Sequence, residues 1–363
     1  MAGCFTIPQE KDIISDMKDT RASLKQNYAN PYLHKPLPMS QHIREAGFVE
    51  KQVELSHITM NYVEGPKNGP PLVLVPAQMG TWQSYYKVLP ILAKQFWVFA
   101  IDVRGHGRSS WTPGDYTWDT VSGDVAEFIS TVVKQPAILS GNSSGGIIAL
   151  WCAAHASHWV SAAVLEDAPV FSTEMPRFRD QDKFVYNGIK HTVEAIGDIH
   201  HRDLANYYTN QVMPINERRV KRMPQWFVRW LSKKLKQTEK RHPGEPIALD
   251  QWYIPYILKL QFTSLKMYDP DFGRAFVDGR IYGTFDHAQA LTVVRCPLLV
   301  LHADWQRLPQ YGLVGAMDDD DAKHIQQLAP QTHYQKIAAK HVIHVFNPRR
   351  FIEAIVNFTN QVL

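Results

Sequence analysis

The pentapeptide Gly-Asn-Ser-Ser-Gly at residues 141–145 constrains the fold of this chain more than any other segment. A short apolar run, 137–140, precedes it, and a small-residue segment able to form a helix, 146–150, follows it. A strand that turns sharply into a helix is the setting of the G-x-S-x-G nucleophile elbow. The two glycines are needed because a side chain two positions before or after the serine would collide with neighbouring backbone. The pattern therefore predicts that Ser143 projects above the end of a strand.

Three further motifs agree with this interpretation. An apolar run at 71–76 leads into a loop, and another at 97–102 leads into the motif Asp102-x-Arg-Gly-x-Gly-x-Ser109. A late histidine, His341, precedes a final helical segment. With these motifs, residues 52–363 resemble serine hydrolases of the α/β-hydrolase fold superfamily. The resemblance is to esterase and lactonase members, such as zearalenone-type lactonases, that carry their acid after the strand following the nucleophile helix.

The resemblance implies an α/β fold, with a mostly parallel sheet flanked by helices and an inserted helical lid. We expect an N-terminal extension at 1–50, a first part of the core at 51–169, the lid at 170–293 and a second part of the core at 294–363. Two antiparallel strands are expected within 51–64, and further strands at 71–76, 97–102, 136–141, 161–166, 297–302 and 332–337. Helices are expected at 81–94, 117–133, 144–156, 319–328 and 349–362.

Two segments stand outside this alternation of strand and helix. The first 50 residues are polar, with a helix expected at 10–26 and an extended arm after it. This extension either packs on the body or mediates self-association, for example as a homodimer. The interval 170–293 is rich in aromatic and basic residues. Most of its aromatic side chains are expected to fill the core of the lid and a few to line a pocket, whereas its basic stretches at 218–222 and 233–236 are expected to be solvated helix faces.

The composition argues against several classes of function. The net charge is only +4 over 363 residues, without a dense basic cluster interleaved with aromatic residues, so nucleic-acid binding is not expected. No apolar run approaches the roughly 18 residues of a membrane span, and the N-terminus lacks the pattern of a secretory signal. Three scattered cysteines, Cys4, Cys152 and Cys296, fit a reduced, cytoplasmic protein. The latter two are expected to be small buried hydrophobes.

The resemblance assigns a catalytic triad to Ser143, His341 and Asp167. A serine hydroxyl is a weak nucleophile, so an imidazole must take its proton and a carboxylate must orient that imidazole. His341 lies between a predicted strand and the last helix, where this fold places its base, although Lys340 replaces the glycine that most relatives have there. His344 is expected to be a packed or hydrogen-bonded structural residue.

The identity of the acid is open among three residues. Asp167 is preferred because it follows the strand at 161–166. Its spacing from the serine along the sequence is similar to that of the acid in haloalkane dehalogenases and some zearalenone-type lactonases. Asp304 is the second candidate, since the commonest acid position follows the strand at 297–302, but Gln306 occupies the usual place there. Glu166 is the third. The acidic run at 318–321 is expected to cap a helix.

Two backbone N–H groups are expected to form the oxyanion hole. One belongs to Ser144, at the start of the helix after the elbow, and the other to Gln78, in the loop after the strand at 71–76. The usual His-Gly of this loop is replaced by Pro76-Ala77, but a backbone donor does not depend on side-chain identity. No cofactor or metal is expected, because an isolated pair such as His200-His201 is not a ligand set.

These expectations describe a serine hydrolase that cleaves a carboxylic ester or lactone of a hydrophobic small molecule through an acyl-enzyme. Dehalogenase and epoxide hydrolase chemistry is not expected, because both families need a carboxylate nucleophile where Ser143 stands. The acid position, Pro76 and the aromatic lid favour a hydrophobic or macrocyclic lactone. C–C bond hydrolysis or another acyl transfer on the same triad remains open, as does a catalytically idle ligand receptor or binding protein.

Overall fold

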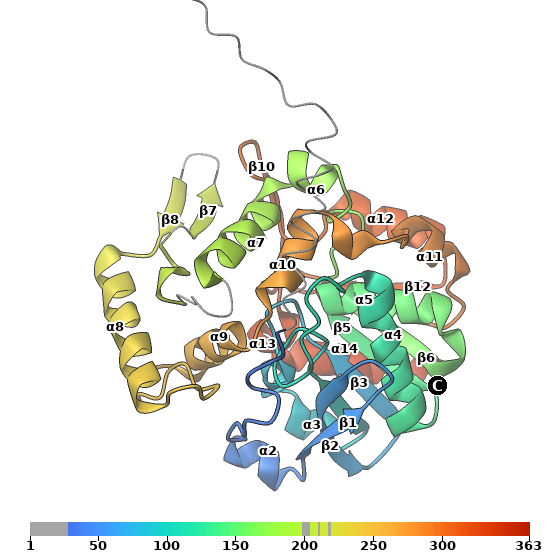
Figure 1. Ribbon diagram of the computed structural model, residues 1–363. Helices are drawn as coiled ribbons and strands as arrows, with labels where there is room; N and C mark the ends of the chain where they lie inside the picture. Colours follow the sequence, from blue (N-terminus) through green and yellow to red (C-terminus); the bar gives the residue numbers. More distant parts are fainter. Residues whose placement is uncertain (1–27, 198–203, 210, 217–218) are drawn as a thin grey trace, which may run out of the picture.

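The computed structural model describes residues 28–197, 204–209, 211–216 and 219–363 (Figure 1). The helix expected at 10–26, Cys4 and the pair His200-His201 lie outside these residues. The described part of the N-terminal arm packs on the body, because the side chain of Asn30 donates hydrogen bonds to the carbonyls of Gly107 and Ser109, at 2.9 and 2.6 Å.

A central sheet of eight strands organises the molecule, in the order β1-β2-β4-β3-β5-β6-β9-β12. The strands β1 to β2 and β2 to β4 pair antiparallel, and the remaining neighbours pair parallel. All of the predicted strands are present, with ends that differ by a few residues. They are β1 (Val49–Glu54), β2 (Thr59–Lys67), β3 (Pro71–Val75), β4 (Trp97–Ile101), β5 (Ala137–Asn142), β6 (Val160–Glu166), β9 (Leu298–His302) and β12 (Thr332–Lys336).

Helices cover both faces of this sheet. They are α3 (Leu89–Leu92), α4 (Trp118–Phe128), α5 (Ser144–His155), α12 (Asp319–Leu328), α13 (Ile343–Phe346) and α14 (Pro348–Val362), with a short α2 (Gln41–Glu45) before β1. The prediction of one helix at 81–94 was wrong. A 3-10 turn, η1 (Trp82–Tyr85), stands there and is followed by the four-residue α3, which carries Pro90 in its first turn. Proline lacks a backbone N–H and starts a helix more readily than it continues one.

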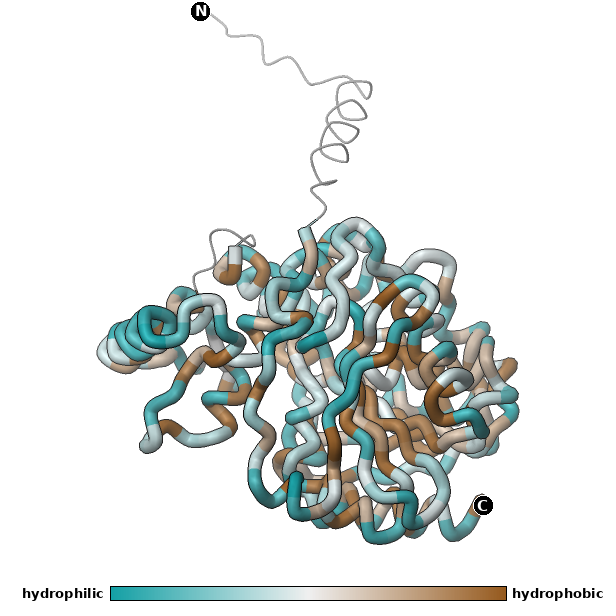
Figure 2. The backbone as a smooth tube through the Cα atoms, turned by 60° about the horizontal axis from the view of Figure 1, so that its bottom comes forward, coloured by the Kyte–Doolittle hydropathy of each residue, from teal (hydrophilic) through white to brown (hydrophobic). Residues whose placement is uncertain are grey.

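The core lies in two layers, one on each face of the sheet. Along β3, Val73 and Val75 pack into the layer that contains side chains of α4 and α5. Leu72 and Leu74 point to the opposite layer, which contains side chains of α3 and α14. Continuous apolar strands are typical of parallel sheets buried on both faces. In Figure 2 the apolar, brown stretches gather accordingly in the middle of the molecule.

The chain between β6 and β9 is largely helical, and we call it the insertion. It contains α6 (Arg177–Asp180), α7 (Lys183–Ile196), η4 (Leu204–Asn206), β7 (Val212–Asn216), β8 (Arg219–Arg222), α8 (Gln225–Arg241), α9 (Tyr256–Lys266), α10 (Pro270–Val277), η5 (Arg280–Tyr282) and α11 (His287–Val293). The expectation of a helix face at the basic stretch 218–222 was wrong, because Arg219–Arg222 form β8, which pairs antiparallel with β7. A further hairpin, β10 (Gln306–Leu308) and β11 (Gly312–Val314), follows β9. Within the described residues, no helix has both the length and the apolar character needed to cross a membrane.

The two internal cysteines differ in burial. Cys152, on α5, is fully buried, as predicted, and burial raises the pKa of its thiol. Cys296 is only partly buried, which corrects the expectation of a buried residue. It lies at the entry to β9, where the chain emerges from α11 at the edge of the core.

Candidate active site

Ser143 occupies a sharp turn between β5 and α5. Its backbone has φ 54° and ψ −121°, a conformation that costs energy in a residue with a side chain. A Cβ atom on Gly141 would lie 1.9 Å from the carbonyl oxygen of Gly145, and one on Gly145 would lie 2.3 Å from the carbonyl oxygen of Val75. Both distances are far below van der Waals contact. The elbow therefore requires glycine at both positions, because a side chain there would collide with neighbouring backbone, as the sequence predicted.

Hydrogen bonds tie this turn to the neighbouring strand end and to the loop that carries His341. The backbone N–H of Ser143 donates to the carbonyl of Glu166 at 2.9 Å. The side-chain amide of Asn142 donates to the same carbonyl at 3.1 Å and to the carbonyl of His341 at 3.2 Å. The ends of β5 and β6 and the loop after β12 are thus held together by residues adjacent to the serine.

His341 and Asp167 form a hydrogen-bonded pair. Nδ1 of His341 donates to Oδ2 of Asp167 at 2.7 Å, and Oδ1 of Asp167 accepts the backbone N–H of Ala303 at 3.0 Å. The carboxylate is 2% exposed, whereas the imidazole is 41% exposed. Because Nδ1 is engaged by the carboxylate, Nε2 is the ring nitrogen that remains for proton exchange in the cavity.

The environment of this pair raises the pKa of His341 above its ordinary value. Burial acts to lower the pKa, but the hydrogen bond to Asp167 and the negative charge of that carboxylate outweigh the effect of burial. The protonated form of the imidazole is therefore stabilised. A group that accepts a proton during a reaction needs such stabilisation.

The other two candidate acids lie apart from the His341 imidazole. Asp304 is exposed, and its backbone N–H donates to the carbonyl of Ala339 at 2.9 Å. Glu166 is fully buried and accepts hydrogen bonds from the backbone N–H and Nδ1 of His344, at 2.8 and 2.9 Å. Among the described residues, Asp167 is the one whose carboxylate bonds to the His341 side chain. His344 is a packed, hydrogen-bonded residue, as predicted.

Ser143 and His341 line the same cavity, which has a volume of about 180 Å³. Gln78 and Ser144 line it as well. The remaining wall is mostly apolar and comes from the insertion and the β10–β11 region. It consists of Pro169, Ser172, Thr173, Phe178, Asp182, Phe184, Val185, Ile189, Phe276, Leu313, Gly315 and Ala316. A few aromatic residues of the insertion reach the cavity, as predicted, and they are phenylalanines.

The backbone N–H groups of Gln78 and Ser144 have no hydrogen-bond acceptor among the described residues. Ser144 is the first residue of α5, and the first N–H groups of a helix point outward without intrahelical partners. The loop that carries Gln78 is fixed, because the side-chain amide donates to the hydroxyl of Tyr268 at 2.8 Å. Two free donors at the wall of the serine cavity can stabilise a developing negative charge.

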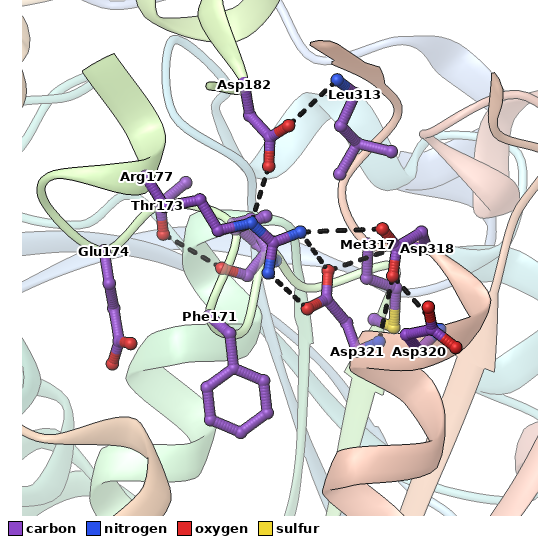
Figure 3. Close-up of polar contacts among 12 residues, drawn as sticks. Phe171, Thr173, Glu174, Arg177, Asp182, Leu313, Met317, Asp318, Asp320 and Asp321 are labelled. Atoms are coloured by element: carbon purple, nitrogen blue, oxygen red, sulfur yellow. Dashed lines mark hydrogen bonds and ion pairs between the residues drawn. The ribbon is translucent and has the colours of Figure 1, made fainter. Parts of the chain in front are cut away.

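The buried carboxylate of the cavity wall was not foreseen from the sequence. Asp182 is 3% exposed, and its carboxylate accepts from Arg177 at 2.7 Å, from Arg307 at 2.7 Å and from the backbone N–H of Leu313 at 3.0 Å. Figure 3 shows Asp182 between Arg177 and Leu313. The two guanidinium groups compensate the buried charge, so Asp182 does not present a free carboxylate to the cavity.

The same two arginines connect the insertion to the core. Arg177 bonds to Asp321 at 2.8 Å, and Arg307 bonds to Asp318 at 2.6 Å. Asp318 also caps α12, since its side chain accepts the backbone N–H groups of Asp320 and Asp321. The acidic run thus caps a helix, as predicted, and in addition anchors the cavity wall. Nothing local in the sequence indicated this second role, because the partners come from distant segments.

The described residues contain no group of three or more His, Cys, Asp or Glu side chains placed to hold a metal ion. The chemistry that the arrangement offers is instead that of a serine hydroxyl, an imidazole bonded to a carboxylate, and two free N–H donors around an apolar cavity. Each of these groups projects from the carboxyl end of a strand or from the loop after it.

Comparison with known proteins agrees with this architecture. A model of the alpha/beta hydrolase family matches residues 72–354, more than half of the chain. A fluoroacetate dehalogenase from Burkholderia sp is 28% identical over 151 residues, which cover 40% of this chain and 48% of that protein. A 2-(acetamidomethylene)succinate hydrolase from Mesorhizobium japonicum is 30% identical over 140 residues, which cover 38% of this chain and 50% of that protein. The chain thus spans about half the length of these curated relatives.

Solved structures share the fold over a longer part of the chain. The enol-lactonase from Burkholderia xenovorans has a TM-score of 0.56 and 14% identity, covering 85% of this chain and 100% of that one. The structure of E-2-(acetamidomethylene)succinate hydrolase has a TM-score of 0.57 and 17% identity, covering 86% and 99%. Identities this low show the fold alone. The predicted α/β-hydrolase fold is confirmed.

Proposed function

We propose that this chain, which belongs to the alpha/beta hydrolase family, is a serine hydrolase that cleaves a carboxylic ester or lactone of a hydrophobic small molecule. The observation that carries the proposal is the shared cavity. Ser143 on its strained turn and His341, bonded to Asp167, line one mostly apolar cavity together. A nucleophile, a base and a residue that orients the base form the constellation of acyl transfer.

In the proposed reaction, the Ser143 hydroxyl attacks the acyl carbon while Nε2 of His341 accepts its proton. The carbonyl oxygen becomes an oxyanion that accepts hydrogen bonds from the N–H groups of Gln78 and Ser144. Each such donor contributes about 2.7–4 kcal/mol to stabilising the transition state in sites of this kind. The intermediate then expels the alcohol, which takes the proton from His341. Water attacks the acyl-enzyme by the same steps and releases the acid.

Asp167 has two tasks in this scheme. Its hydrogen bond to Nδ1 keeps the proton on that nitrogen, so that Nε2 faces the reaction as the acceptor. Its charge stabilises the imidazolium that forms when Ser143 is deprotonated. The raised pKa of His341 reflects this stabilisation.

The walls of the cavity indicate the substrate class. Phe178, Phe184 and Phe276 face it from the insertion, together with aliphatic side chains. The one buried carboxylate of the wall, Asp182, is paired with two arginines. A hydrophobic acyl or lactone group therefore fits better than a charged one, and the insertion is proposed to act as the lid over the serine.

A fluorophosphonate probe tests the proposal, because it reacts covalently with an activated serine. We expect labelling of the folded protein and loss of labelling in Ser143→Ala. The matched control is Ser172→Ala, which removes a serine of the same cavity whose hydroxyl donates to the carbonyl of Ala316 and should leave labelling unchanged. Hydrolysis of aryl esters and macrolactones should follow the same pattern. A folded protein that neither reacts nor hydrolyses would be a ligand receptor instead.

A further inference from the structure

The outer face of the insertion carries a surface that the proposed reaction does not use. Helix α8 lies at an edge of the molecule, away from the central sheet (Figure 1), and its tube is mostly teal in Figure 2. Its inward stripe consists of Val228, Leu231, Leu235 and Thr238. The opposite stripe is exposed and basic, and it comprises Arg229, Lys233, Lys236 and Lys240.

Exposed aromatic rings adjoin this basic stripe. Trp226 is 70% exposed and Trp252 is 89% exposed, and no other tryptophan of the described residues is exposed to a comparable extent. Tyr253, Tyr256 and Ile257 are exposed beside them in the segment before and at the start of α9. Full exposure of large apolar side chains is unfavourable in water. A concentration of them on one surface marks an interaction site.

Ring contacts join the two segments into one surface. Phe227 lies 6.0 Å from Trp226 and 5.6 Å from Trp230 between ring centroids. Trp230 lies 6.4 Å from Tyr253, which in turn lies 5.7 Å from Trp252. We call the exposed rings together with the basic stripe the aromatic–basic patch.

The charge of the patch is strongly one-sided. Helix α8 carries six Lys or Arg residues and one acidic residue, a surplus larger than the net charge of +4 of the whole chain. The acidic residue, Glu239, is itself paired with Lys266 of α9. Arg229, Lys233, Lys236 and Lys240 are exposed. Arg241 pairs with Asp250, and Lys234 lies 5.8 Å above the ring of Tyr253.

We propose that the aromatic–basic patch docks the protein onto the surface of an anionic lipid bilayer. Tryptophan and tyrosine prefer the bilayer interface, where the apolar ring leaves water and the polar N–H or O–H stays hydrated. A basic helix with aromatic residues at its edge lies in the plane of that interface. The basic stripe supplies charge complementarity to anionic headgroups, and each Lys or Arg near such a surface strengthens binding by about fivefold.

The position of the patch suits the delivery of a lipophilic molecule to the cavity. Phe227 contacts Tyr208 with centroids 6.4 Å apart, and Tyr208 contacts Tyr207 at 5.0 Å. Tyr207 lines a second cavity of about 450 Å³. This cavity shares three wall residues, Phe184, Val185 and Ile189, with the serine cavity. Aromatic side chains thus extend from the patch to the vicinity of Ser143.

Vesicle co-sedimentation of the full chain tests the docking. We expect binding to vesicles of phosphatidylcholine with about one third phosphatidylserine, weaker binding to phosphatidylcholine alone, and loss of binding in high salt. Lys233→Glu with Lys236→Glu should weaken binding by at least about 25-fold. Trp226→Ala with Trp252→Ala should weaken it by at least about tenfold.

Matched controls distinguish binding through this patch from general effects of net charge and exposed apolar groups. Lys323→Glu with Arg349→Glu changes the net charge equally at residues that are 70% and 78% exposed on other helices, and should leave binding within about twofold. Val293→Ala with Leu363→Ala removes exposed apolar groups at the end of α11 and at the C-terminus, and should have as little effect. In Figure 1 both α11 and the C-terminus lie on the side of the molecule opposite α8. Ser143→Ala should abolish hydrolysis and bind vesicles normally, so a failure of the proposed function is distinguishable from a failure of docking.

Three outcomes would overturn the proposal. The first is the absence of binding to anionic vesicles. The second is binding that survives both patch variants, since another surface would then be responsible. The third is sedimentation showing a dimer that the Trp226→Ala, Trp252→Ala variant dissociates, without vesicle binding, because the patch would then join two copies of this chain.

Discussion

Two histidine–carboxylate pairs lie side by side at the end of β6, and their difference shows why one of them is the proposed catalytic pair and the other is not. Asp167 bonds to His341, and the preceding residue, Glu166, bonds to His344. The nitrogen–oxygen distances, 2.7 and 2.8 Å, are nearly equal. The acids are consecutive and the histidines are three residues apart. The chemistry of the two pairs is therefore closely similar.

The surroundings of the two imidazoles differ sharply. The His341 side chain is 41% exposed and lines the cavity that contains Ser143. The His344 side chain is 1% exposed and stacks on Tyr85, with ring centroids 4.1 Å apart. Its Nε2 is buried without a hydrogen-bond partner among the described residues. One imidazole can exchange a proton with a substrate, and the other can only hold its neighbours in place.

The buried pair nevertheless supports the exposed one. The Glu166 carboxylate fixes the chain at His344, just after His341, while its backbone carbonyl accepts the N–H of Ser143. The hydroxyl of Tyr85 donates to the carbonyl of Val75 at 2.8 Å, directly before the loop of Gln78. The pair Glu166–His344 thus stiffens the scaffold from which the proposed nucleophile, the proposed base and one N–H donor project.

The two pairs should differ most in their effect on turnover, and removal of the His341 imidazole tests this. His341→Ala should lower kcat for an aryl ester by about 10⁴-fold or more, because the serine loses its base. The free energy of unfolding should also fall, because the Asp167 carboxylate, which is 2% exposed, loses the imidazole bonded to it. Steady-state kinetics and urea unfolding measure both effects. A variant that keeps wild-type turnover would remove His341 from the mechanism.

Asp167→Asn should lower kcat by about 10⁴-fold, because an amide at this position favours the wrong tautomer of His341. The residual activity should also have a different pH dependence. Activity rises as His341 loses its proton, and the variant lacks the charge that raises the pKa of His341 while burial still lowers it. The rising limb of the pH–rate profile should therefore move to lower pH. A limb that moves to higher pH would contradict the assignment.

Glu166→Gln should affect stability more than turnover. The change replaces the buried carboxylate that holds His344, and disrupting a buried pair costs about 3 kcal/mol of unfolding free energy. Urea unfolding measures this loss. The labelling of Ser143 by a fluorophosphonate at low temperature should persist. Complete loss of labelling in a protein that is still folded would mean that Glu166, rather than Asp167, serves His341.

The smallest effect is expected at the third acid. Asp304→Asn should change kcat by less than about twofold, because the exposed carboxylate does not bond to His341. It is the matched control for Asp167→Asn, since both variants convert an aspartate after a strand of the sheet into asparagine. If Asp304→Asn were the more damaging of the two, the acid would move to Asp304 and the observed pair would be structural.

The sheet and the elbow were readable from the sequence because their signals are local. Apolar runs of five to seven residues mark each central strand, and the glycines around Ser143 mark a turn that no side chain at those positions would allow. The helix expected at 81–94 is interrupted because Pro90, which lacks a backbone N–H, is tolerated only in the first turn of a helix, so α3 begins beside it. Propensity along a segment does not show where such a break falls.

The pairing of side chains across the sheet was only partly predictable. The choice of Asp167 over Asp304 rested on family resemblance, and the sequence alone left both open. The pairing of Glu166 with His344 and the wall residue Asp182 were not foreseen, because the partners lie in segments remote along the chain. Such contacts depend on which strand ends meet at one edge of the sheet.

The most direct test of the central claim is whether Ser143 and His341 act as one unit. Turnover of one aryl ester should be measured for Ser143→Ala, His341→Ala and the double variant. The expected result is that the double variant is no slower than the slower single variant, because removal of either residue already disables the pair. Losses that multiply in the double variant would show that the two side chains act independently, and would contradict the proposed mechanism.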